Sequence, residues 1–103
     1  MQEKVETFNK NKGVHNKPMP IYARLLDIQS ELGELSKEYL KNSKYGTIDF
    51  KITDDFELEF GDVLYALLSL ANELNLNAND ALDKVIDKYK NRIKENNNLG
   101  SGR

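Results

Sequence analysis

The sequence predicts an all-α protein, a bundle of about three to four helices. Association into a homodimer or homotetramer is expected to complete this bundle. Several stretches of the 103 residues carry apolar side chains at alternating steps of three and four, the period of an amphipathic helix. Only six glycines and two prolines interrupt the chain. No alternating polar and apolar run is long enough for a strand, and the nearest candidate is 47–52. Because a chain of this size buries its surface inefficiently, a second subunit is expected to complete the core.

The amino-terminal half contains a short helix and a long one. Residues 1–12 are expected to form the short helix, and residues 13–20 a loop, because glycine, asparagine and proline favour non-helical backbone. Pro20 fits at or just before a first helical turn. The apolar stripe after it consists of Ile21, Leu25, Ile28, Leu32, Leu35 and Tyr39. The segment 42–51 interrupts the pattern and is expected to be a loop.

Two further helices are expected in the carboxyl-terminal half. The first can be capped by Asp54, with Glu57 three residues on at the spacing of a capping box. Its stripe consists of Phe56, Phe60, Val63, Leu67, Leu70 and Leu74. A turn is expected at 75–77, where Asn77 and Asp80 offer another capping pair. The stripe of the last helix consists of Leu82, Ile86, Tyr89 and Ile93.

Composition excludes several classes of protein. Without cysteine there is no disulfide framework and no thiolate metal site. A net charge of −2 lacks the clustered basic charge of a nucleic-acid-binding protein. The longest nearly apolar run, 63–71, is about half the length of a membrane-spanning helix, and residues 1–4 have no apolar signal core behind them. We therefore expect a cytoplasmic protein without nucleic-acid or membrane partners, with one domain at 1–95 and a disordered tail at 96–103.

Acidic side chains fall in register on the two central helices. The rows consist of Asp27, Glu31, Glu34 and Glu38 on the first helix and Asp55, Glu59 and Asp62 on the second. Each of these residues stands one position before an apolar stripe residue. Two helices packed through their stripes would carry both rows along the border of the contact, where the rows can face each other across a cleft. An all-oxygen set of ligands suits Mg²⁺ or Mn²⁺ and not zinc or copper.

A solvated acidic face is the alternative interpretation of these rows. On the first central helix, Lys37, Lys41 and Lys44 can pair with the acids. On the second, no lysine or arginine occurs between residues 56 and 74. Other metal sites do not fit, because the one histidine, His15, cannot supply the paired glutamate and histidine motifs of a di-iron bundle. The chain also has no EF-hand loop and no glycine-rich phosphate loop.

Two spaced acid pairs, Glu31-Leu-Gly-Glu34 and Glu59-Phe-Gly-Asp62, resemble those of the MazG-like all-α nucleoside triphosphate pyrophosphohydrolases. The resemblance extends to the flanking sequence. SELGELSKEYL is similar to the first motif helix of the family, ELEFGDVLYALLSLANELNLNANDAL to the second motif, and DKYKNRI to a Lys-aromatic-x-x-Arg element. In many members a further glutamate precedes the first motif acid, and this chain has Ser30 there.

The resemblance implies hydrolysis of (deoxy)nucleoside triphosphates to the monophosphate and pyrophosphate, with Mg²⁺ as cofactor and Mn²⁺ as a possible substitute. It implies a role in clearing unwanted nucleotides. The implied catalytic metal ligands are Glu31, Glu34, Glu59 and Asp62. Candidate substrate contacts are Lys88 and Arg92 for phosphate, with His15 and Tyr65 near the nucleotide. For the two basic residues, a solvated face near the carboxyl end of a helix is the alternative.

Two other functions stay open at this point. Phosphoribosyl-ATP pyrophosphohydrolase, from the same superfamily, shares the pattern of four acids. A helical interaction or regulatory module could have the fold without the activity. The Lys88-Tyr89-x-x-Arg92 element favours the MazG-like enzymes, and the presence of all four acids favours an enzyme.

Overall fold

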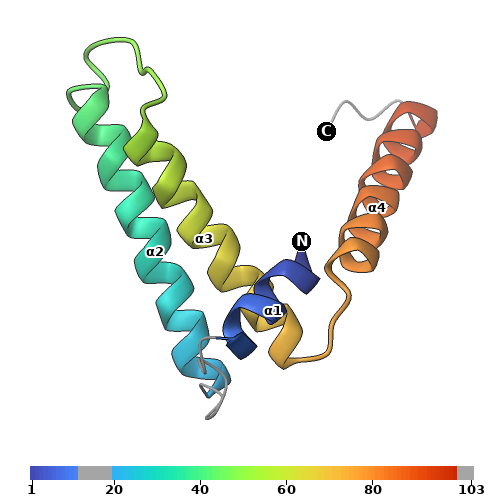
Figure 1. Cartoon of the computed structure of the whole chain (residues 1–103). Helices are drawn as coiled ribbons and strands as arrows, with labels where there is room; N and C mark the ends of the chain where they lie inside the picture. The colour runs from blue at the N-terminus through green and yellow to red at the C-terminus, as the bar shows by residue number, and fades with distance from the viewer. Residues whose placement is uncertain (12–19, 100–103) are drawn as a thin grey trace.

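The computed structural model of the chain describes residues 1–11 and 20–99 and contains four helices within them (Figure 1). The helices are α1 (Gln2–Asn11), α2 (Ile21–Asn42), α3 (Asp54–Glu73) and α4 (Ala78–Leu99). These ranges contain no strand, and the predicted all-α class is confirmed. Within them, no helix combines the length and the apolar character needed to cross a membrane. The last helix continues to Leu99, past the predicted domain end at residue 95.

The four helices form an open V (Figure 1). Helices α2 and α3 lie side by side as one limb, and α1 packs against α3 near the vertex. Helix α4 leaves the vertex as the other limb and makes few contacts with the other three helices. The radius of gyration is 17.9 Å, whereas a compact domain of this length has about 13 Å. The single chain is therefore much more open than a closed bundle.

Two helix starts are set by side-chain caps. The Oγ1 atom of Thr53 accepts a hydrogen bond from the backbone N–H of Phe56 (3.1 Å), so Thr53 caps α3. The expectation that Asp54 caps this helix is wrong. Thr53 has the extended backbone of a capping residue, and Asp54 is the first helical residue, where its charge favours the amino end of the helix. The predicted capping pair at the start of α4 is confirmed, because Asn77 Oδ1 accepts a hydrogen bond from the N–H of Asp80 (3.0 Å).

The link between α2 and α3 closes the end of the limb remote from the vertex. Ser43 is fully buried and its Oγ accepts a hydrogen bond from the N–H of Gly46 (3.0 Å). The positive φ of +84° at Gly46 lies in the left-handed region that favours glycine. Beyond this turn, the ring of Phe50 lies between those of Tyr39 and Phe56, at centroid distances of 5.0 and 4.8 Å. This aromatic cluster holds the ends of α2 and α3 together.

The buried core is small and partly polar, and it lies near the vertex. The buried apolar side chains in the described ranges are Val5, Ala66 and Leu68. Beside them, Asn9 Nδ2 donates to Ser69 Oγ (3.3 Å). The guanidinium of Arg24 donates to both carboxylate oxygens of Glu73, at 3.3 and 3.1 Å. Many apolar stripe residues of α2, α3 and α4 stay exposed in the single chain.

Candidate metal and substrate site

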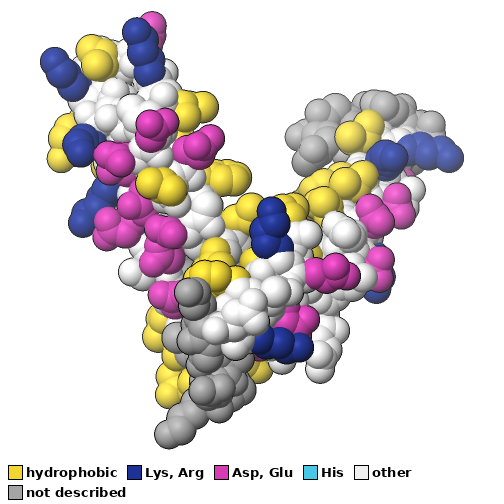
Figure 2. All heavy atoms as spheres, in the orientation of Figure 1, with side chains coloured by type: hydrophobic (Ala, Val, Ile, Leu, Met, Phe, Trp, Pro, Cys, Tyr) yellow, Lys and Arg dark blue, Asp and Glu magenta, His cyan; other side chains and the backbone are white. Residues whose placement is uncertain are grey.

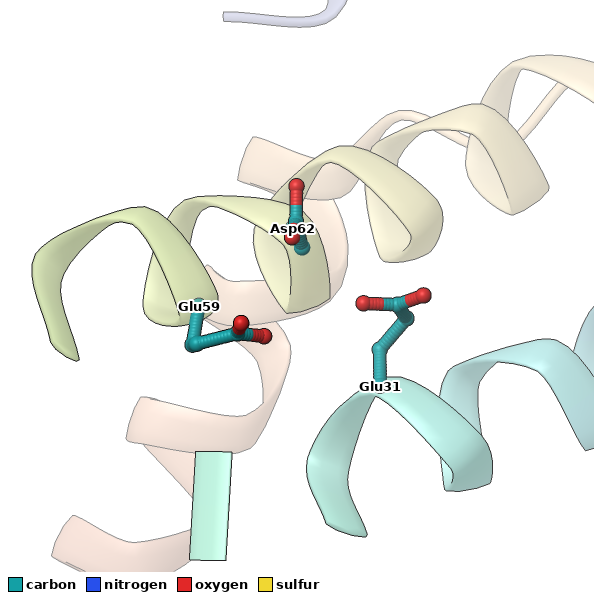
Figure 3. Close-up of side chains that lie close together, drawn as sticks. All are labelled: Glu31, Glu59 and Asp62. Atoms are coloured by element: carbon teal, nitrogen blue, oxygen red, sulfur yellow. The ribbon is translucent and has the colours of Figure 1, made fainter. Parts of the chain in front are cut away.

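Three carboxylates from two helices meet on the α2–α3 limb (Figure 3). Helix α2 presents Glu31, and successive turns of α3 present Glu59 and Asp62, three residues apart and therefore on one face. One carboxylate oxygen of each lies within 4.8 Å of the others. Glu31 and Glu59 are half-buried and Asp62 is exposed. We call these three residues the carboxylate cluster.

The carboxylate cluster is a concentration of like charge. Partial burial raises the pKa of Glu31, and repulsion from Asp62, Asp27 and Glu59 raises it further. Partial burial also raises the pKa of Glu59, and repulsion from Asp62 and Glu34 adds to the shift. Across residues 1–11 and 20–99, no lysine or arginine forms an ion pair with any member of the cluster. The charge has no counterion from the described part of the chain.

The donors fit a hard divalent cation. The cluster offers carboxylate oxygens only, with no imidazole and no thiolate among its three members. Mg²⁺ and Mn²⁺ prefer such oxygen ligands. A cation would also relieve the repulsion that raises the two glutamate pKa values. The arrangement can therefore hold a metal ion.

The fourth predicted ligand, Glu34, lies outside the carboxylate cluster. Its side chain is exposed, and its Oε1 lies 3.7 Å from Lys37 Nζ. Its charge nevertheless contributes to the raised pKa of both Glu31 and Glu59, so it stands at the rim of the same site. One turn further along α2, Glu38 accepts a hydrogen bond from Asn42 Nδ2 (3.2 Å).

The two predicted phosphate contacts, Lys88 and Arg92, lie on α4, the other limb of the V. Lys88 Nζ lies 5.5 Å and Arg92 Cζ 6.0 Å from the ring centroid of Tyr89, within range of cation–π attraction. Helix α4 has few contacts with α2 and α3. Within one chain, the structure does not bring these two cations to the carboxylate cluster.

The other two candidates have different surroundings. The hydroxyl of Tyr65 donates a hydrogen bond to Asn9 Oδ1, and its ring packs edge-on against Phe8 with centroids 6.1 Å apart. These contacts join α3 to α1, and the predicted nucleotide contact of Tyr65 stays a prediction. His15 lies outside the described residues.

Arg24 was not among the residues predicted from the sequence. Besides its two hydrogen bonds to Glu73, this buried side chain approaches Asp27, with Nη1 3.5 Å from Oδ2. It thereby neutralises one member of the acidic row on α2. The signal in the sequence is the spacing of three between Arg24 and Asp27, which places both on one helix face.

The chain is similar in sequence and in structure to known proteins. A family model described as the MazG nucleotide pyrophosphohydrolase domain matches residues 23–96. The chain is 41% identical over 81 residues to "Uncharacterized protein YpjD" of Bacillus subtilis (strain 168), a match that covers 76% of this chain and 68% of that protein. It also superposes on a crystal structure described as the "putative pyrophosphatase YPJD" from Bacillus subtilis. The TM-score is 0.66 at 32% identity, covering 85% of this chain and 86% of that one.

Proposed function

The chain belongs to the MazG nucleotide pyrophosphohydrolase family and is a nucleotide pyrophosphohydrolase, and from this premise we propose that it cleaves (deoxy)nucleoside triphosphates to the monophosphate and pyrophosphate with Mg²⁺. One observation carries the choice of substrate and metal. The carboxylate cluster gathers three acidic side chains with no basic partner in the described ranges. Such a site binds a polyphosphate only when cations accompany it.

The residues of the carboxylate cluster would hold the metal through their oxygens. Bound Mg²⁺ would supply charge neutralisation at the phosphates and a lowered pKa of a water molecule. Without a cation, the cluster repels a nucleoside triphosphate, which carries about four negative charges. Glu34 at the rim adds to the negative field that attracts cations. The role of the chain is thus to position charge, which is the main requirement of phosphoryl transfer.

The reaction class is tested with purified protein on the common ribo- and deoxyribonucleoside triphosphates and on phosphoribosyl-ATP, with Mg²⁺, with Mn²⁺ and with EDTA. Anion-exchange chromatography separates the nucleotide products. We expect monophosphate and pyrophosphate with either metal and no turnover in EDTA. Diphosphate and orthophosphate would contradict the proposal. Turnover of phosphoribosyl-ATP alone would assign the chain to the other branch of the superfamily.

The metal ligands are tested by single substitutions. Glu59→Gln and Asp62→Asn keep the size of each side chain and remove one charged ligand, so we expect turnover to fall about 100-fold or more. Glu57→Gln is the matched control, since Glu57 is exposed on the same helix and stands outside the carboxylate cluster. Near-normal turnover in both cluster variants would show that the metal is held elsewhere.

A further inference from the structure

A buried arginine lies in the limb that carries most of the acidic side chains. Figure 2 shows acidic side chains gathered along the α2–α3 limb. Among the lysines and arginines of the described ranges, only Arg24 is buried, at 6% exposure. Its guanidinium donates to both carboxylate oxygens of Glu73 on α3, and its Nη1 lies 3.5 Å from Asp27 Oδ2 on α2. We call these three residues the arginine clamp.

The arginine clamp and the carboxylate cluster occupy the same faces of the two helices. The face of α2 that they share carries, at steps of three and four, Arg24, Asp27 and Glu31. The face of α3 that they share carries, at steps of four, three and four, Asp62, Ala66, Ser69 and Glu73. The clamp joins the helices near the vertex, and Glu31 follows Arg24 by two turns, or about 10 Å along α2. The rotation of α2 at the clamp therefore decides where Glu31 stands.

A metal site tolerates little displacement of its ligands. Mg²⁺ requires near-ideal octahedral geometry, and functional side chains have to be held to within about 0.5 Å. A side chain at the surface of a helix stands about 6 Å from the axis, so a rotation of α2 by about 10° would move Glu31 by about 1 Å. The bond of Arg24 to Glu73 is bidentate and fixes direction as well as distance. The clamp is thus suited to prevent such a rotation.

We propose that Arg24 is a positioning residue of the metal site. Through its bonds to Glu73 and Asp27 it fixes the rotation of α2 on α3, and so sets the place of Glu31 in the carboxylate cluster. Arg24 itself contacts neither the ion nor the nucleotide. The proposal rests on the proposed function, because the ion that the cluster holds is the one that the reaction uses.

The selectivity between two ions separates a positioning role from a merely stabilising one. Mg²⁺ needs strict geometry, whereas Ca²⁺ accepts a flexible arrangement of oxygen ligands. A loosened α2 therefore weakens the binding of Mg²⁺ more than that of Ca²⁺. A loss of stability alone leaves the ratio of the two dissociation constants unchanged. Isothermal titration calorimetry of the full chain without nucleotide measures both constants, at a temperature where circular dichroism shows every variant to be folded.

Arg24→Gln removes the charge and the bidentate bond. We expect the ratio of the Mg²⁺ to the Ca²⁺ dissociation constant to rise about tenfold, as for other residues that hold metal ligands in place. Arg24→Lys keeps the charge without the planar fork, so an intermediate ratio is expected. The matched control is Val5→Ala, which truncates a buried side chain of α1 outside the clamp and should keep the wild-type ratio. Glu59→Gln removes a ligand and identifies the heat that comes from the cluster.

Glu73→Gln tests whether Arg24 acts through this ion pair. We expect it to shift the ratio as Arg24→Gln does, and the double variant to shift it no further than either single variant. Wild-type ratios in folded Arg24→Gln and Glu73→Gln would overturn the positioning role alone. The same shift in Val5→Ala would also overturn it, because the shift would then follow from lost stability. A wild-type protein that binds neither ion would overturn the proposed function, and this proposal with it.

Discussion

At the scale of single residues, we expect Glu59 to destabilise the metal-free fold. Its pKa is raised above the ordinary 4.5 by partial burial and by repulsion from Asp62. Between the two pKa values the folded chain binds more protons than the unfolded chain, so stability falls as the pH rises through this window. In EDTA at neutral pH we expect Glu59→Gln to melt a few degrees above wild type.

This difference in melting temperature has a defined pH dependence. It is expected to shrink as the pH falls toward 4.5, where the wild-type carboxyl becomes protonated and its repulsion is lost. Mg²⁺ should raise the melting temperature of wild type and have much less effect on Glu59→Gln. Circular dichroism melts measure both effects, with Glu57→Gln as the control. A variant that melts below wild type at neutral pH would show that Glu59 is not destabilising.

The ion pair of Arg24 with Glu73 has the opposite effect on stability. The two side chains are 7% and 9% exposed, so truncation of Arg24 removes the guanidinium from a nearly buried carboxylate. We expect Arg24→Ala to lower the free energy of unfolding by about 3 kcal/mol. Lys10→Ala is the contrast, because Lys10 and Glu6 are 3.8 Å apart and well exposed, and it should cost less than about 1 kcal/mol. Urea titrations at one protein concentration measure the free energy of unfolding of both variants. Equal losses in the two variants would refute the role of burial.

At the scale of elements, the direction of α4 depends on α1, because Gln2 of α1 is hydrogen-bonded to residues on both sides of the turn between α3 and α4. Gln2→Ala removes the hydrogen bonds to Asn72, Leu76 and Ala78, and we expect α4 to sample a wider range of directions. The chain has no cysteine, so spin labels can be placed at exposed positions with Gln29→Cys on α2 and Asp87→Cys on α4.

Pulsed electron resonance then gives the distribution of distances between the two labels. Dilution of labelled chains with unlabelled ones restricts the signal to pairs within one chain. We expect a narrow distribution with Gln2 and a broad one with Gln2→Ala, while Glu3→Ala, at an exposed neighbouring position, stays narrow. Equal widths of the distance distribution in all three proteins would show that α1 does not hold the turn between α3 and α4 in place.

The helices themselves were predictable because the apolar period is a local property of the sequence. The stripes on either side of Pro20 and of the 42–51 loop correspond to α1, α2 and α3, and the last stripe to α4. The cap of α3 was assigned one residue too late. Thr53 and Asp54 are adjacent and both carry a side-chain oxygen that can accept from a helix N–H. Only the backbone conformation, extended at Thr53 and helical at Asp54, decides between them.

At the scale of the whole molecule, the open V leaves too little core for one chain. The extents are 54 × 40 × 23 Å, and the stripe of α4 is exposed. If a second copy covers it, folding and association are coupled, and the melting temperature should rise with protein concentration. Each tenfold increase adds about 1.4 kcal/mol to the free energy of unfolding of a dimer. Melting curves over a hundredfold range of protein concentration measure this rise in melting temperature. A wild-type melting temperature that is independent of protein concentration would contradict the coupling.

The sequence by itself determined the four helices, the face that each acid occupies and the resemblance to the MazG family. These properties depend on the 3.6-residue period and on local motifs, which a linear pattern records. Only the tertiary structure decided that Glu31 meets Glu59 and Asp62 while Glu34 pairs with Lys37 at the rim. Only the tertiary structure decided that α4 leaves the bundle. The physical reason is that both outcomes depend on contacts between residues far apart in the chain, such as those of α2 with α3 and of Gln2 with Asn72.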